Sequence, residues 1–141
     1  MIDHISVAVR DIQVAEAFYS ALLAPLGMRK WREWPNAAVG YGKKYPEFWI
    51  NRRAEMAPVE ADSGVHICLR ATSSEAVDAF HAAALAAGGT SDGAAGPPPE
   101  NHEWFYAPFS REPHMHRNAV EVVLARDEHA AYVLQLRGRF L

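Results

Sequence analysis

The chain has one cysteine, no long uncharged apolar run and no excess of basic residues, and each absence excludes a class of protein. With Cys68 alone, neither an intrachain disulfide framework nor a cysteine-based zinc site can form. No stretch has the length of a membrane span or the pattern of a signal peptide. The formal net charge is -3 with acids and bases interspersed, so neither nucleic acid nor membrane is expected as a partner. We therefore expect a soluble, cytoplasmic protein that binds small molecules or other proteins.

The sequence contains two copies of one segment. A shift of 62 positions aligns His4 with His66 and Phe18 with Phe80 without a gap. The same shift aligns Ile5 with Ile67, Ala17 with Ala79, Ala21 with Ala83, Leu23 with Leu85, Ala24 with Ala86 and Gly27 with Gly89. Because polar, aromatic and helix-ending positions recur in one register, the pattern indicates a duplicated supersecondary unit. A chain of 141 residues has the length of one domain, so each copy is expected to form half of it.

The first half reads as strand, helix and three strands. Residues 2–9 alternate, with His4 and Ser6 on the face opposite to the aliphatic residues. A helix is predicted from an N-cap at Asp11 to Gly27, with its last turn distorted by Pro25. Strands are expected over 28–34, 37–42 and 47–51. The first module therefore spans about residues 1–52.

The second half repeats this order after a linker over about residues 53–63. Its module spans about 64–125 and begins with a strand over 64–71, followed by a capping box at Thr72–Glu75 and a helix ending at Gly88–Gly89. Residues 90–101 are expected to form a loop with at most one weak edge strand, before strands over 104–109 and 118–124. In the tail, 126–141, residues 130–136 fit either an additional strand or a short helix, and residues 137–139 are expected in solvent.

Three residues stand out as candidate metal ligands: His4, its repeat mate His66, and Glu121 in the last strand of the second half. Two imidazoles and one carboxylate form a facial triad that suits a divalent first-row metal and leaves coordination positions open. A lone histidine in a strand is more often a hydrogen-bonded core residue, but the symmetry of the pair favours ligation. Glutamate among β-branched residues also requires a reason.

Other candidates have simpler explanations. His114 and His116 fall in an expected hairpin turn, and His81, His102 and His129 are expected on the surface. Cys68 shares a face with His66, as a cavity wall or as a small buried hydrophobe. Trp49, Trp104 and Tyr106 could line an apolar pocket or pack in the core. No catalytic serine triad or phosphate-binding glycine loop is present.

Together, these segments resemble the vicinal oxygen chelate superfamily, which includes glyoxalase I, extradiol dioxygenases, fosfomycin-resistance thiol transferases and bleomycin-binding proteins. The resemblance covers residues 1–125 and is carried by segments 1–11, 17–19, 23–27, 48–50, 64–67, 79–85 and 120–122. It implies an α+β fold of two βαβββ modules, whose mixed sheet curls around a shared cavity, in a homodimer. It also implies one divalent metal (Fe, Mn, Ni, Zn or Co) bound by His4, His66 and Glu121.

The chain departs from this family where glyoxalase-type members carry a fourth, acidic ligand. Trp49 stands in that place, and the nearest acid, Glu47, is at the edge of the strand. We therefore expect three protein ligands, in a metal-dependent lyase, isomerase or dioxygenase acting on a small oxygen-chelating substrate. Glu121 would serve as ligand and proton acceptor. The alternatives are a metal-free, bleomycin-resistance-like binding protein and a fold without chemistry.

Overall fold

The computed structural model describes residues 1–56, 67, 69–93, 109–111, 118–124, 132–133 and 136–138, and from residue 90 onward it describes the backbone. The described elements of the first half are β1 (Ile5–Val9), α1 (Ile12–Leu23), η1 (Ala24–Leu26), β2 (Arg29–Trp34), β3 (Ala38–Gly42) and β4 (Phe48–Arg52). Those of the second half are β5 (Leu69–Arg70), α2 (Ser74–Ala86), β6 (Thr90–Gly93), β7 (Phe109–Arg111) and β8 (Asn118–Leu124), followed by β9 (Tyr132–Val133) and β10 (Leu136–Gly138).

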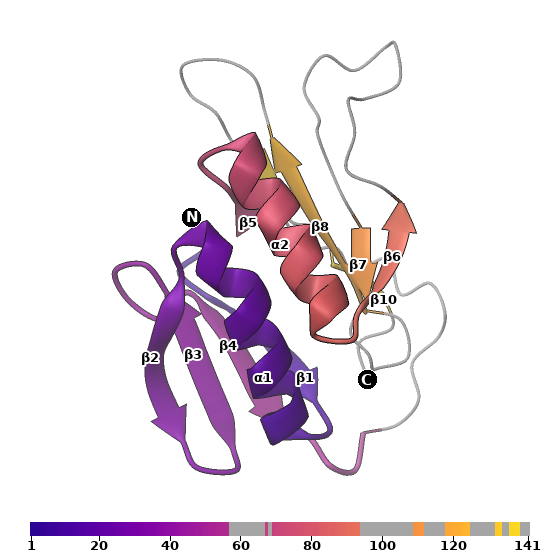
Figure 1. Ribbon diagram of the computed structural model, residues 1–141. Helices are drawn as coiled ribbons and strands as arrows, with labels where there is room; N and C mark the ends of the chain where they lie inside the picture. The colour runs from indigo at the N-terminus through magenta and orange to yellow at the C-terminus, as the bar shows by residue number, and fades with distance from the viewer. Residues whose placement is uncertain are drawn as a thin grey trace.

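The first half forms a four-stranded sheet in the order β1-β4-β3-β2, in which β1 runs parallel to β4 and the other pairs are antiparallel. The alternation predicted for the first strand is confirmed, because Val7 and Val9 are fully buried while Ser6 is exposed. Helix α1 covers the face that carries these valines (Figure 1). The opposite face of the sheet, which we call the open face, carries Ser6.

The predicted boundaries of the first helix are confirmed. The Asp11 carboxylate accepts hydrogen bonds from the backbone N–H groups of Gln13 and Val14, which satisfies two donors that the helix itself cannot pair. Pro25 lies in the 3-10 turn η1 that follows the α-helix. Gly27 ends this turn with φ of 74°, a left-handed conformation that glycine adopts without a steric penalty.

The core joins the two halves through their helices, which lie side by side (Figure 1). Phe18 and Tyr19 of α1 meet edge to face at 5.4 Å, and the Tyr19 ring contacts Phe48 of β4 at 5.2 Å between centroids. Phe80 of α2 is fully buried in the same cluster. Burying aromatic rings of this size contributes about 1.5–3 kcal/mol each, so the helix pair is a main source of stability.

The second half repeats the strand pairing of the first. Strand β5 pairs in parallel with β8, as β1 does with β4, and β7 pairs antiparallel with β8. Strand β8 has the predicted bounds, and β6 is the expected edge strand in the order β10-β8-β7-β6. Strand β7 begins at the residue where the predicted strand 104–109 ends, and residues 101–108 lie outside the described part. Both halves thus follow the βαβββ order, and the predicted α+β class is confirmed.

One local prediction was wrong. The N-cap of α2 is Ser73, whose side chain accepts from the Ala76 N–H, so the capping box does not start at Thr72. In the tail, the backbone of Leu136–Gly138 forms β10. The tail therefore follows the strand alternative, because β9 and β10 pair with backbone groups of β8 that would otherwise form an exposed edge.

Of the helices in the described part of the chain, none is long and apolar enough to span a membrane.

Candidate functional site

A cavity of about 550 Å³ lies on the open face of the first sheet. Its polar lining consists of Asp3, His4, Ser6, Asn51 and Arg53. Its aromatic and apolar lining consists of Trp34, Ala38, Tyr45, Pro46 and Trp49. We call this space the open-face cavity. Its volume lies within the range typical of small-molecule sites.

His4 stands at the wall of this cavity, one residue before β1, with 56% of its side chain exposed. Its Nδ1 lies 2.8 Å from Oδ2 of Asp3. Because an ionised carboxylate can only accept, Nδ1 carries the hydrogen, which in the neutral ring makes Nε2 the acceptor nitrogen. Metal-binding histidines commonly have this arrangement, in which a carboxylate fixes the tautomer. The conformation of His4 therefore fits the predicted role of metal ligand.

Trp49 is held on several sides. In the sheet register it stands opposite Ser6 of β1 and Gly40 of β3. Its Nε1 donates to the Pro46 carbonyl at 3.2 Å, and its ring stacks on Trp34 with centroids 4.9 Å apart and planes 19° apart. A Cβ on Gly40 would lie 2.9 Å from two atoms of this indole. The absence of a side chain at Gly40 is therefore what lets the indole lie over β3.

The floor of the cavity is braced by Asn51, two residues after Trp49 on the same face. Its Nδ2 donates to Oγ of Ser6 and, at 3.2 Å, to the Val7 carbonyl. Within the described part of the chain, its Oδ1 is buried without a hydrogen-bond partner. These bonds join the side chains of β1 and β4 and fix the cavity floor.

The backbone register places Glu121 at the repeat position of Trp49. Val7 of β1 pairs with Ile50, and its repeat mate Leu69 pairs with Val122. The residue before each partner is Trp49 in the first half and Glu121 in the second. The sequence prediction that an indole stands where the other half has a carboxylate agrees with this register.

The structure leaves the complete metal site as a prediction. His66 lies outside the described residues, as do Cys68, Trp104 and Tyr106, and for Glu121 only the backbone is described. Among the side chains that are described, no three from histidine, cysteine, aspartate and glutamate cluster as a metal site would require. Of the predicted site residues, His4 and Trp49 are brought together in one cavity.

Sequence reasoning did not predict the other residues that line this cavity, among them Trp34, Tyr45, Asn51 and Arg53. Asn51 could have been found, because strand alternation puts it on the same face as Trp49. Tyr45 belongs to the turn between β3 and β4, and Arg53 follows β4, so periodicity carries no signal for either.

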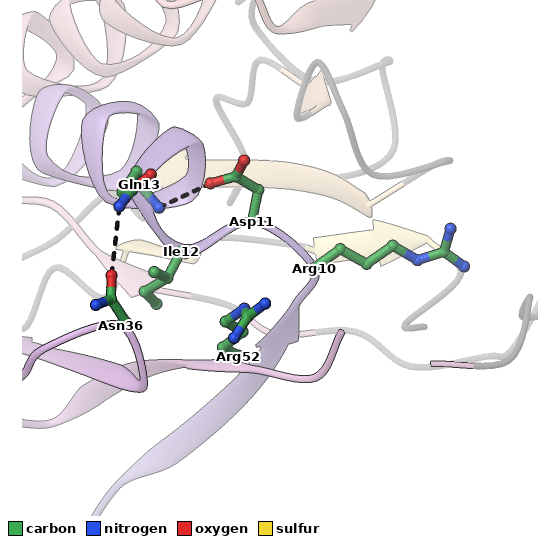
Figure 2. A pocket seen from close by; sticks show the side chains of 6 residues that line it. All are labelled: Arg10, Asp11, Ile12, Gln13, Asn36 and Arg52. Carbon is green, nitrogen blue, oxygen red and sulfur yellow. Dashed lines mark hydrogen bonds between the residues drawn. The ribbon is translucent and has the colours of Figure 1, made fainter. Parts of the chain in front are cut away.

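A second, smaller cavity of about 330 Å³ lies where β1 enters α1 (Figure 2). The carboxylate of Asp11 caps the helix there, and Gln13 Nε2 donates to Asn36 Oδ1 at 3.3 Å. Arg10 donates to the Met56 carbonyl and points away from Arg52. Because these two guanidinium groups do not converge, we do not regard this cavity as the functional site.

Comparisons with known proteins agree with the fold. The model of the Glyoxalase/Bleomycin resistance protein/Dioxygenase superfamily matches residues 1–122. A crystal structure of a glyoxalase/bleomycin resistance protein from Albidiferax ferrireducens T118 is similar with a TM-score of 0.68 and 30% sequence identity, over 86% of this chain and 95% of that one. The comparison with curated proteins gave no match.

The fold is therefore of the α+β glyoxalase type. The chain belongs to the glyoxalase/bleomycin resistance protein/dioxygenase superfamily, as the sequence resemblance predicted.

Proposed function

We propose that the protein is a metal-dependent enzyme acting on a small molecule that presents adjacent oxygen atoms. The observation that supports this best is the position of His4: it lines the open-face cavity, and its Nδ1 bond to Asp3 makes Nε2 the nitrogen that can act as a ligand. With His66 and Glu121, His4 would provide two nitrogens and one oxygen, a set that suits a divalent Fe, Mn, Ni, Zn or Co ion.

In the proposed reaction, each of the cavity's side chains has a separate role. When bound, the metal supplies a Lewis acid that polarises an oxygen of the substrate. Asp3 holds the His4 ring in the required tautomer, and the Glu121 carboxylate accepts a proton from the substrate. The side chains of Trp34 and Trp49 provide an apolar wall of the cavity for the carbon part of the substrate. This division fits lyase, isomerase and dioxygenase chemistry.

Elemental analysis of protein purified without a chelator or a His-tag tests the proposal. We expect about one bound transition metal per chain, by analogy with single-site enzymes of this ligand set. The metal should be lost in His4→Ala and in His66→Ala, and retained in His129→Ala, which changes a histidine predicted to be on the surface. Metal-free wild-type protein that gains no metal on titration with Fe, Mn, Ni, Zn or Co would exclude the enzyme.

A second candidate is a metal-free binding protein of the bleomycin-resistance kind. It is favoured by the aromatic share of the cavity, where Trp34, Tyr45 and Trp49 outnumber His4, the one described candidate ligand from the sequence. In this case His4 and His66 would be polar residues of the cavity wall and would bind no metal. Tight binding of an aromatic ligand by chelator-treated protein, unchanged in His66→Ala, would support this candidate over the enzyme.

We also propose that the chain forms a homodimer. Within the described residues, the open-face cavity is lined by residues between 3 and 53 alone. A second copy of the chain could supply the side of the cavity that faces away from the first sheet. Light scattering on the purified protein measures the mass directly; a monomer at all concentrations would contradict this proposal.

A further inference from the structure

The side-chain amide of Asn51 is held in one orientation by its neighbours on β1. Its Nδ2 lies 3.2 Å from the Val7 carbonyl oxygen, which can only accept, so the nitrogen of the amide and not its oxygen must face Val7. The same nitrogen donates its second hydrogen to Oγ of Ser6. Oδ1 is left buried without a partner in the described part of the chain, which costs stability. The two bonds of the nitrogen therefore outweigh the unpaired oxygen and determine how this side chain lies.

The bond from Asn51 also orients the hydroxyl group of Ser6. Because Oγ accepts from the amide, its own hydrogen must turn away from Asn51. Among the described residues, no group accepts this hydrogen. Ser6 is exposed and lines the open-face cavity together with His4, which lies two residues earlier in the chain. The cavity floor thus presents an O–H donor whose direction is set from the neighbouring strand β4.

We propose that the Ser6 hydroxyl donates a hydrogen bond to an oxygen atom of the substrate, and that Asn51 is the positioning residue that orients it. This inference rests on the proposed function, since it adds a donor beside the proposed metal site. His4 and Ser6 are two residues apart, which corresponds to about 7 Å along an extended chain. A substrate held at His4 can therefore place a second oxygen at Ser6 with a backbone of only a few atoms.

A donor at this place suits the chemistry proposed for Glu121. When its carboxylate takes a proton from a carbon atom of the substrate, the electron pair of the broken C–H bond moves to a neighbouring carbonyl oxygen, which becomes an enolate oxygen. A donor that is already oriented stabilises such developing charge without having to reorganise. The group that Ser6 would recognise is therefore an acceptor oxygen, either a carboxylate or a carbonyl that becomes an enolate.

Oxalate is the probe for this donor, because its four oxygens accept hydrogen bonds and donate none. Calorimetry and the backbone amide signals of β1 and β4 in NMR spectra would follow its binding to chelator-treated, full-length protein, so that the result does not depend on a metal. We expect Ser6→Ala to weaken oxalate binding about three- to tenfold, the effect of one hydrogen bond. Ser6→Thr keeps the hydroxyl and should bind within about twofold of the wild type. Equal affinities of the wild type and Ser6→Ala, or no binding by the wild type, would overturn the proposal.

Asn51→Asp tests the orienting role of the amide. An ionised carboxylate cannot donate, so it would accept the Ser6 hydrogen and turn the O–H away from the cavity. Ser6→Ala should therefore cost about three- to tenfold in oxalate affinity in the wild type and almost nothing in the Asn51→Asp background. The charge of the new carboxylate cancels, because it is present in both proteins of the second comparison. The same loss in both backgrounds would show that Asn51 does not orient the hydroxyl.

These variants differ in their risk to the fold. Ser6 is exposed, so Ser6→Ala and Ser6→Thr should unfold at the urea concentration of the wild type. Asn51→Asp brings a carboxylate toward the Val7 carbonyl, and circular dichroism would show whether it folds. If it does not, Asn51→Leu takes its place in the same comparison, because leucine cannot donate to Ser6 either.

The two proposals can fail separately. If the purified protein holds no metal but Ser6→Ala weakens oxalate binding, the metal-dependent function fails and the Ser6 donor stands. If the protein holds a metal through His4 and His66 but Ser6→Ala leaves oxalate binding unchanged, the donor fails and the metal site stands.

Discussion

Gly40 and Trp49 stand opposite each other on strands β3 and β4, and the indole of Trp49 fills the space that a side chain on Gly40 would need. An added Cβ would lie 2.9 Å from Cε2 and Cη2 of the indole and from Cβ of Pro46. An added methyl group would therefore meet both the indole of Trp49 and the ring of Pro46. The wall of the open-face cavity therefore depends on a residue that has no side chain.

We expect Gly40→Ala to lower the free energy of unfolding by about 1–3 kcal/mol, the usual cost of inserting a methyl group into a packed site. The indole should shift, since the ring is the part of the contact that can rotate. Urea unfolding measures the stability, and tryptophan fluorescence reports the change around Trp49.

Gly42→Ala provides the comparison. A Cβ there would lie 1.7 Å from the backbone oxygen of Tyr45, a contact that only a movement of the turn 43–46 can relieve. This variant should lose more stability than Gly40→Ala. Equal stability of Gly40→Ala and the wild type, with unchanged fluorescence, would contradict the packing described for Trp49.

Much of the first half could be predicted from sequence because its signals are local. Asp11 and Gly27 mark the two ends of the first helical segment through capping and a left-handed backbone, and alternation assigned the faces of β1. The repeat of His4 and His66, and the place of Trp49 relative to Glu121, followed from the same register. The helix ends and the strand faces depend on neighbours a few positions apart, and the repeat can be read by comparing the sequence with itself.

The Trp34–Trp49 stack could not be predicted in this way. The pairing of β2 with β3 is interrupted between Lys30 and Arg32, leaving Trp31 in a bulge, so simple alternation along β2 fails to assign Trp34. The stack also requires a side chain of β2 to reach one on β4, across the glycine of β3. Such a contact depends on the register of three strands, for which no single segment carries a signal.

Removing the first N-cap tests the local basis of α1. Asp11→Ala leaves the N–H groups of Gln13 and Val14 without their carboxylate acceptor, and should cost about 1 kcal/mol of stability in urea unfolding. Asp11→Ser keeps a capping oxygen and should remain within a few tenths of a kcal/mol of the wild type. If both variants lose the same stability, the carboxylate acts through its charge rather than through the cap.

Because the phenol of Tyr41 is buried, we expect the free energy of unfolding to fall at alkaline pH. Burial raises the pKa of its phenol from 10.0 to about 12, and its hydroxyl lies 3.1 Å from Oγ of Ser20 and donates to the Glu16 carbonyl. Because the folded state favours the neutral phenol, its contribution is complete below pH 10 and is lost as the pH rises towards 12. Each unit of pKa difference corresponds to about 1.4 kcal/mol.

Tyr41→Phe is the matched variant for that measurement. It should be less stable than the wild type at neutral pH, because it lacks the hydroxyl contacts with Ser20 and Glu16. Between pH 10 and 12 its unfolding free energy should fall less steeply, and the two curves should converge. Hydrogen bonds to Glu16 and Glu33 raise the pKa of Lys30, and this side chain is present in both proteins, so the comparison isolates Tyr41. Parallel curves would contradict the assignment to Tyr41.

Trp49→Glu tests the proposed metal site by adding a fourth candidate ligand. Position 49 corresponds to Glu121 in the repeat, and its strand lines the cavity together with His4. If His4, His66 and Glu121 bind a metal, the added carboxylate should raise metal affinity and close one open coordination position. Trp49→Gln is the control, because it removes the same stacking on Trp34 without adding charge. Competition with a chelator measures both affinities; tighter metal binding by the Glu variant than by the Gln variant is the expected result, and equal affinities would place the metal away from Trp49.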